Sequence, residues 1–184
     1  TDSNGASGVP YTFYCYYFDY ESGALLSDVT FFTVETAKPE HINVDFEMDY
    51  EIVEGTLVKA DVTPAGGYTG DYYFDVLNSI QVNDYLENMD FLNDESRVVE
   101  YWWANAVQEM MKDMSATDII ANFTCVGTNP DDTPKSHYEF ELLANHDYYL
   151  FAFAMEENGL CCSTPKVVKL TTGDVAMSDN EITP

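Results

Sequence analysis

The stretch that decides the fold runs from Tyr148 to Gly173 and reads YYLFAFAMEENGLCCSTPKVVKLTTG. It opens with an unbroken apolar and aromatic run, turns through acidic residues that close on Gly159, and resumes with a second run that ends in threonine. Aromatic and β-branched residues on both sides of a glycine-containing turn favour two paired antiparallel strands. We therefore predict a β-hairpin in this segment.

A second copy of this pattern lies near the other end of the chain. The segment from Tyr11 to Ala37 reads YTFYCYYFDYESGALLSDVTFFTVETA, again two apolar runs around an acidic turn with a glycine. With a single one-residue gap, Tyr11 aligns with Tyr148 and Gly23 aligns with Gly159. Such self-similarity is typical of repeated modules, so we predict that both segments form the same hairpin.

The repeat divides the chain into three parts. We interpret residues 1–37 as the closing hairpin of a preceding, incomplete repeat, and residues 38–173 as one full module. The tail at 174–184 is similar to the residues that follow the first hairpin, and we interpret it as the start of a following repeat. Neighbouring repeats of the same chain are therefore expected to be partners of the full module.

Elsewhere in the full module, apolar and polar residues alternate with the period of two that a half-buried strand requires. In the run INVDFEM, for example, Ile42, Val44 and Phe46 alternate with polar side chains. Pro64 and the glycines after it break the chain before the next such run. We predict strands at 42–48, 55–63, 71–77, 137–143, 147–155 and 164–171.

The segment between the third and fourth of these strands has helical periodicity. An apolar stripe recurs there at spacings of three and four residues, formed by Val99, Trp103, Ala106, Val107, Met110 and Met114. Asn93, which precedes two acidic residues, is the predicted N-cap. We predict a helix at about 94–114 and a further short turn at 116–121, both within a helical insertion at 81–121. The whole pattern favours an all-β, antiparallel β-sandwich with an α-helical insertion.

Two stretches resemble known families. The run LLANHDY, which ends at Tyr148, resembles the L-x-P-x-T-x-Y stretch of fibronectin type III domains, although Ala144 and His146 replace its usual Pro and Thr. The run ADVTP at Ala60–Pro64, followed by YYFDV from Tyr72, is similar to a module of exported Bacteroidetes lipoproteins.

The resemblance implies an immunoglobulin-like or fibronectin type III sandwich in which Tyr148 forms a corner before the sixth strand. It also implies an address outside the cell, in an exported lipoprotein at the cell surface, with the outer membrane as the expected location. Contact with the membrane is expected only through a lipid anchor outside this chain. The resemblance implies no activity, because this fold hosts many functions.

The charge excludes some partners. The chain has 7 basic and 33 acidic residues, for a formal net charge of −26. Such a surface repels phosphates, so we predict no binding to nucleic acid or to an anionic membrane surface. No apolar run reaches the roughly 18 residues that a membrane-spanning helix needs.

Residues for catalysis or metal binding do not stand out. The four cysteines lack a C-x-x-C spacing, and the adjacent pair Cys161 and Cys162 is poorly placed to form a disulfide with itself. The histidines, His41, His137 and His146, stand apart in the sequence without H-x-x-x-H spacing or a nearby nucleophile. We therefore assign no catalytic, cofactor-binding or metal-binding residue and expect no cofactor.

The aromatic residues of the predicted helix give the strongest functional hypothesis. Val98, Tyr101, Trp102 and Asn105 form a second face beside the apolar stripe, with Tyr101 expected to be exposed. Exposed Tyr and Trp rings can stack on a sugar or anchor a protein contact, but a neighbouring module could instead cover this face. We expect a non-catalytic module that binds a glycan or a protein. The alternative is a structural spacer, and an enzyme or enzyme inhibitor ranks third.

Overall fold

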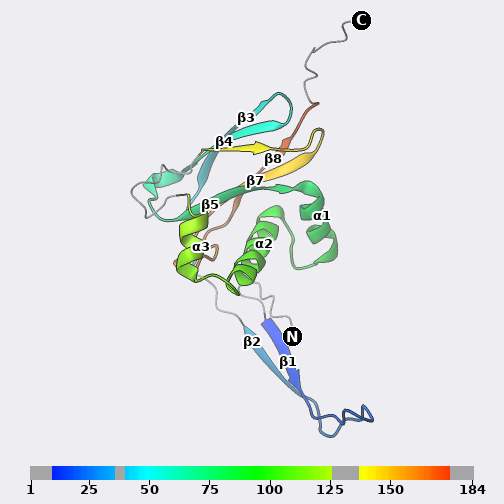
Figure 1. Cartoon of the computed structure of the whole chain (residues 1–184). Coiled ribbons are helices and arrows are strands. Elements are labelled where there is room, and N and C mark those ends of the chain that lie inside the picture. Colours follow the sequence, from blue (N-terminus) through cyan, green and yellow to red (C-terminus); the bar gives the residue numbers. More distant parts are fainter. Residues whose placement is uncertain (1–9, 36–39, 126–136, 175–184) are drawn as a thin grey trace, which may run out of the picture.

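The computed structural model describes residues 10–35, 40–125 and 137–174 of the chain. Figure 1 shows a body of stacked β-sheets with helices against one side, and a two-stranded hairpin at one end. The strands are β1 (Pro10–Cys15), β2 (Thr30–Glu35), β3 (Phe46–Val53), β4 (Leu57–Pro64), β5 (Tyr72–Asn78), β6 (His137–Glu141), β7 (Asp147–Ala154) and β8 (Lys166–Thr171). The helices are α1 (Ser79–Asn88), α2 (Glu95–Met110) and α3 (Ala116–Phe123), and a 3-10 turn covers Ala65–Gly67. The described chain is mostly β, in three antiparallel sheets, as the sequence predicts.

Two three-stranded sheets form the body. One has the strand order β3-β4-β6 and the other β5-β7-β8, with every neighbouring pair antiparallel. The core between them is drawn from both sheets and includes Phe46, Val58, Ala60, Val62, Phe74, Leu150, Ala152 and Leu170. Full burial of a side chain the size of Leu150 contributes about 1.5–3 kcal/mol, so this layer is a main source of stability.

The outer face of the β5-β7-β8 sheet is buried as well, because the helices cover it. Tyr149, Phe151 and Phe153 of β7 lie in a second core together with Val99 and Trp103 of α2. Strand β7 therefore has both faces covered. This explains why its sequence is continuously apolar instead of alternating.

The first predicted strand begins later than expected. Residues 42–45 lie outside the ladder, and β3 begins at Phe46. The backbone N–H of Ile42 instead donates to the carbonyl oxygen of Cys162 at 2.8 Å. Ile42 and Val44 still pack against the core, so their alternation correctly indicates burial although no strand forms there.

Helix α2 is shorter than predicted. It ends at Met110, and the chain continues to residue 114 in turns. The predicted N-cap Asn93 is wrong by one residue, because the Asp94 carboxylate accepts the backbone N–H of Arg97 at 2.9 Å. This carboxylate satisfies a free N–H of the first turn and places a negative charge at the positive end of the helix.

The turn before β7 is fixed by two buried hydroxyl groups. The Tyr148 hydroxyl oxygen accepts the backbone N–H of Leu143 at 3.0 Å. The Thr172 hydroxyl donates to the Leu143 carbonyl oxygen at 2.6 Å and accepts the His146 backbone N–H at 2.9 Å. These bonds join the start of β7 to the end of β8, and Asn145 adopts a positive φ of 56° between them.

The hairpins β1–β2 and β7–β8 have the same register. In the first hairpin Cys15 lies opposite Thr30. In the second, the aligned residues Ala152 and Lys166 lie opposite each other. The strands of the two hairpins therefore match residue for residue, as the aligned sequences predict.

The turns of the two hairpins match as well. The Ser27 hydroxyl accepts the backbone N–H of Tyr17 at 2.9 Å, and the aligned Ser163 accepts that of Ala154 at the same distance. Each turn also contains one isolated bridge and a glycine with positive φ, of 67° and 81° respectively. The residues that we interpret as the start of a following repeat lie, apart from Asp174, outside the described residues.

The surroundings of the two hairpins differ completely. Every described side chain of β7 except Asp147 is buried. In β1–β2 and its turn, by contrast, the large apolar side chains are exposed, among them Phe13, Tyr14, Tyr17, Phe31 and Phe32. The same local structure is thus fully covered at one place in the molecule and uncovered at the other.

Candidate functional site

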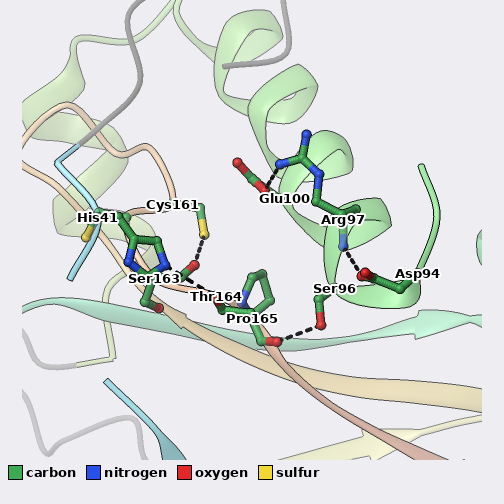
Figure 2. A pocket seen from close by; sticks show the side chains of 10 residues that line it. His41, Asp94, Ser96, Arg97, Glu100, Cys161, Ser163, Thr164 and Pro165 are labelled. Atoms are coloured by element: carbon green, nitrogen blue, oxygen red, sulfur yellow. Dashed lines mark hydrogen bonds and ion pairs between the residues drawn. The ribbon is translucent and has the colours of Figure 1, made fainter. Parts of the chain in front are cut away.

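A hollow of about 360 Å³ lies where the first turn of α2 meets the loop before β8 (Figure 2). Its walls come from three distant parts of the sequence. His41 comes from the segment before β3, Ser96 and Arg97 from α2, and Cys161 and Thr164 from the loop. The fold therefore gathers here polar groups of several kinds that the sequence keeps apart.

Local hydrogen bonds hold the walls of this hollow together. The hydroxyl of Ser96 donates to the carbonyl oxygen of Pro165 at 2.9 Å and so fixes the start of α2 against the loop. His41 lies across the hollow, with its Nε2 at 3.2 Å from the Thr164 hydroxyl oxygen. Helix α2 and the segment at His41 are thereby both attached to the loop at Ser163–Pro165.

The hollow contains the only arginine in the sequence. The Arg97 guanidinium forms an ion pair with Glu100, one turn further along α2. Because a guanidinium has five N–H donors, this pair leaves others available to a ligand. Because the carboxylates of Asp94 and Glu100 also line this hollow, it suits a polar group and not an anion.

The cysteine in this hollow is not an activated nucleophile. Cys161 is buried, and its thiol donates to the Ser163 carbonyl oxygen at 3.0 Å. Burial raises the pKa of this thiol, and the nearby Glu100 carboxylate raises it further. Since the thiolate is the reactive form, the thiol is inert at neutral pH. Cys15, Cys161 and Cys162 are free thiols in the structure.

Two further hollows adjoin the first at the same end of the sandwich. One, of about 430 Å³, shares Thr164 and Pro165 with it and also contains Asp45 and Lys166, whose charged groups are 3.2 Å apart. The other, of about 650 Å³, shares Cys162 and has several carboxylates in its walls. All three therefore lie where the chain enters the body from the β1–β2 hairpin.

The buried thiol of Cys162 and the buried phenol of Tyr72 predict unfolding at alkaline pH. Burial raises the pKa of Cys162 from 9.0 to about 11 and the pKa of Tyr72 from 10.0 to about 12. In the unfolded chain both groups ionise at their ordinary values, so their neutral forms stabilise the folded state below about pH 9. This stabilisation is lost as the pH rises through 11 and 12.

We expect circular dichroism to show loss of structure in that window, together with the late phenolate absorbance of Tyr72. Full phenolate absorbance near pH 10 with native circular dichroism would contradict the expected burial of this phenol.

The four residues of the predicted ligand face do not share one environment. Val98 is fully buried, so its place on an accessible face is wrong. Tyr101, Trp102 and Asn105 are half-buried and pack along the helical layer. For Tyr101 this corrects the expectation of an exposed side chain. The reason is that α1 packs beside α2, so α2 buries one side against the sheet and a second against α1.

Tyr101 is the centre of an aromatic cluster at the surface. Its ring contacts those of Tyr85 in α1 and Phe91 in the loop between the helices, edge to face, at centroid distances of 5.8 and 5.5 Å. Phe91 is 50% exposed. Trp102 points inward instead, with its ring 5.6 Å from that of Phe151. The accessible aromatic surface thus lies over Tyr85, Phe91 and Tyr101.

Asn105 contains a buried polar atom without a partner. Its side-chain oxygen is shielded from solvent and accepts no hydrogen bond from any described residue. An unsatisfied buried acceptor costs about 1–3 kcal/mol. Packing within the described chain therefore does not account for an asparagine at this position, one turn after Tyr101 on α2.

Two comparisons with known proteins give no match. No protein-family model matches the sequence, and no curated protein matches it. Within residues 10–35, 40–125 and 137–174, no three His, Cys, Asp or Glu side chains are grouped so as to hold a metal ion. In the same ranges, no helix combines the length and apolar character needed to cross a bilayer.

Sequence reasoning missed the hollow around Arg97 and its neighbour His41. Both are isolated in the sequence, 56 positions apart, and no motif links them. The one signal in the sequence was that Arg97 is the single arginine of a strongly acidic chain. His137 and His146 lie outside this hollow. His137 hydrogen-bonds to the Asp61 carboxylate, and His146 hydrogen-bonds to the Ala144 carbonyl oxygen.

Proposed function

We propose that this chain is a non-catalytic interaction module of the immunoglobulin and fibronectin type III kind. The strand orders support this proposal, because such domains pair their first, second and fifth strands in one sheet and their third, sixth and seventh in the other. β3-β4-β6 and β5-β7-β8 follow that scheme if α1–α3 replace the fourth strand. The bond from Leu143 N–H to the Tyr148 hydroxyl supports it too, since it matches the tyrosine corner of these folds.

The proposed address is the outer surface of a cell, in an exported lipoprotein. It rests on the sequence resemblance at Ala60–Pro64 and Tyr72. A net charge of −26 is consistent with a domain that stays dispersed in an open aqueous environment. Fractionation of cells that produce the natural protein, followed by protease treatment of intact cells, tests this address. Protection of the domain from added protease would exclude it.

The observation that carries the binding role is the half-exposed cluster of Tyr85, Phe91 and Tyr101. Rings that meet edge to face on a helical layer offer a firm, amphipathic surface for a sugar ring or for an apolar side chain of a partner. The acidic surroundings disfavour anionic ligands. We therefore infer a neutral glycan or an uncharged protein surface as the ligand, with Asn105 as a polar neighbour on the same helix.

A glycan array with the purified chain tests this role. Tyr101→Ala and Phe91→Ala are each expected to weaken any glycan binding by roughly tenfold, because one aromatic contact is lost. Tyr50→Ala, at an exposed aromatic residue on β3 in the other sheet, is the matched control and is expected to bind normally. Thermal denaturation of all three variants separates loss of binding from loss of folding. Undiminished binding by both cluster variants would exclude this face.

The alternative role is that of a spacer, and one observation favours it. The hairpin β1–β2 lies at one end of the body, and β8 leaves at the other, as Figure 1 shows. A domain that the chain enters and leaves at opposite ends adds its whole length to a tandem array. An array without any glycan or protein ligand, combined with neutral behaviour of the cluster variants, would favour the spacer.

A further inference from the structure

The hairpin β1–β2 exposes apolar residues on both of its faces. Phe13 and Phe32 stack on one face, with ring centroids 5.2 Å apart. Tyr14 and Phe31 lie on the other, at 6.5 Å, and Tyr14 is 63% exposed. Large exposed apolar patches on both sides of an isolated hairpin are unusual for a folded chain and indicate an interaction site.

The equivalent hairpin β7–β8 shows how such a hairpin is covered within this molecule. Strand β7 has β5 on the edge that does not face β8, with Phe74 opposite Ala152 and Val76 opposite Leu150. The sheet β3-β4-β6 covers one face of the hairpin β7–β8, and the helices cover the other. Strand β1, by contrast, has a hydrogen-bonded neighbour on one edge only within the described residues.

The shared register assigns each exposed residue of β1 to a buried position of β7. Phe13 corresponds to Leu150, which lies between the two sheets, and Cys15 to Ala152 in the same core. Tyr14 corresponds to Phe151, which lies against the helices. The exposed residues of β1 thus occupy positions that, in β7, lie in the two hydrophobic cores.

The composition of the hairpin strands also suits burial. The stretches 12–15 and 30–34 have no charged residue, although the whole chain has 40. Covering these two stretches would therefore remove no carboxylate from water, and desolvating a carboxylate is the main cost of burying other parts of this acidic surface. Glu35, the one charged residue of β1 and β2, is the last residue of β2.

We propose that β1–β2 completes a β-sandwich unit that precedes Thr1 in the same natural polypeptide. In that unit a strand adds antiparallel to the free edge of β1, in the position that β5 has beside β7. A sheet covers Phe13 and Phe32, and a further apolar layer covers Tyr14 and Phe31. The last hairpin of one unit is then joined directly to the first strand of the next. This inference is independent of the ligand face on α2.

The rate at which Cys15 reacts with N-ethylmaleimide tests the proposal. Cys15 is the only exposed cysteine of the four, and its counterpart Ala152 is fully buried. In the 184-residue chain Cys15 is expected to react as a free thiol. In the natural polypeptide with its upstream residues, it is expected to react more slowly by on the order of a hundredfold, because a thiol in a core reacts only through local opening.

A second position supplies the matched control. Tyr20→Cys in a Cys15→Ser background places the thiol at the tip of the turn, where Tyr20 is 90% exposed and the aligned Glu157 is also exposed. This thiol is expected to react equally fast in both forms. Hydrogen exchange should in parallel show protected β1 amides in the longer form only.

Three outcomes would overturn the proposal. The first is equal reactivity of Cys15 in the two forms. The second is a natural polypeptide without a β-rich unit before Thr1. The third is protection of Cys15 in the 184-residue chain that rises with protein concentration and coincides with dimers in sedimentation, because a second copy would then be the occupant.

Discussion

Replacing Trp103 with alanine is expected to lower the free energy of unfolding by about 3–5 kcal/mol, much of the stability of a typical domain. The Trp103 side chain is 1% exposed, and its ring lies 4.5 Å from that of Tyr73 and 5.5 Å from that of Phe153. Its indole N–H also donates to the Gly159 carbonyl oxygen at 2.6 Å. The substitution would leave a cavity between α2 and the sheet and an unpaired carbonyl in the turn of β7–β8. Urea denaturation followed by circular dichroism measures the loss.

Two companion variants make the Trp103 prediction specific. Trp103→Phe keeps an aromatic ring but removes the indole donor, so its loss should be intermediate. Trp102→Ala removes a half-buried ring of the same size and should cost only about 1–2 kcal/mol. Equal losses for Trp102→Ala and Trp103→Ala would contradict the orientation of α2 described above.

The second large effect is expected from a carboxylate introduced at Ala152 of β7. The aligned residue of β1, Cys15, provides the control position. Ala152→Asp puts a carboxylate in the core between the sheets, where the native residue is 0% exposed and the opposite residue of β8, Lys166, already pairs with Asp45. We expect a loss of at least about 3–5 kcal/mol, the usual effect of an uncompensated buried charge, and therefore an unfolded or aggregated protein. The measurement is the soluble yield together with the melting temperature.

Cys15→Asp is the matched control for Ala152→Asp. It makes the same carboxylate at the aligned position of β1, whose side chain is exposed. In the 184-residue chain this substitution should change the free energy of unfolding by no more than about 0.5 kcal/mol. The melting temperature should therefore stay nearly unchanged. A strong destabilisation by Cys15→Asp in that chain would show that the body itself already covers the β1–β2 hairpin.

Local sequence patterns predicted the elements of this fold well, for a physical reason. The hairpin turns depend on residues that are neighbours in the chain, such as Gly159 with its positive φ and Ser163 with its bond to Ala154. The alternation in β4 likewise follows from one face being buried between the sheets. Such features are fixed within about ten residues, so the sequence alone displays them.

The errors arose where distant elements decide the outcome. Val98 is buried because α1 lies beside α2, and a helical wheel of α2 alone has no information about that neighbour. Residues 42–45 alternate as a strand does, yet no partner strand extends far enough to pair with them. The hollow at Arg97 requires residues 41, 97 and 164 to meet, which only the assembled sandwich brings about.

The bond between Gly55 and Gly173 has a mechanical consequence. The Gly173 N–H donates to the Gly55 carbonyl oxygen at 2.8 Å, which attaches the end of β8 to the turn between β3 and β4. The chain enters the body at the opposite end, before Phe46. Tension between the two ends therefore pulls β3 and β8 lengthwise past their neighbours β4 and β7. The ladder bonds run across the strands, so this load acts on all of them at once instead of opening them one by one. Under tension the sandwich should consequently resist extension and then yield in a single step, with the β1–β2 hairpin outside the loaded sheets.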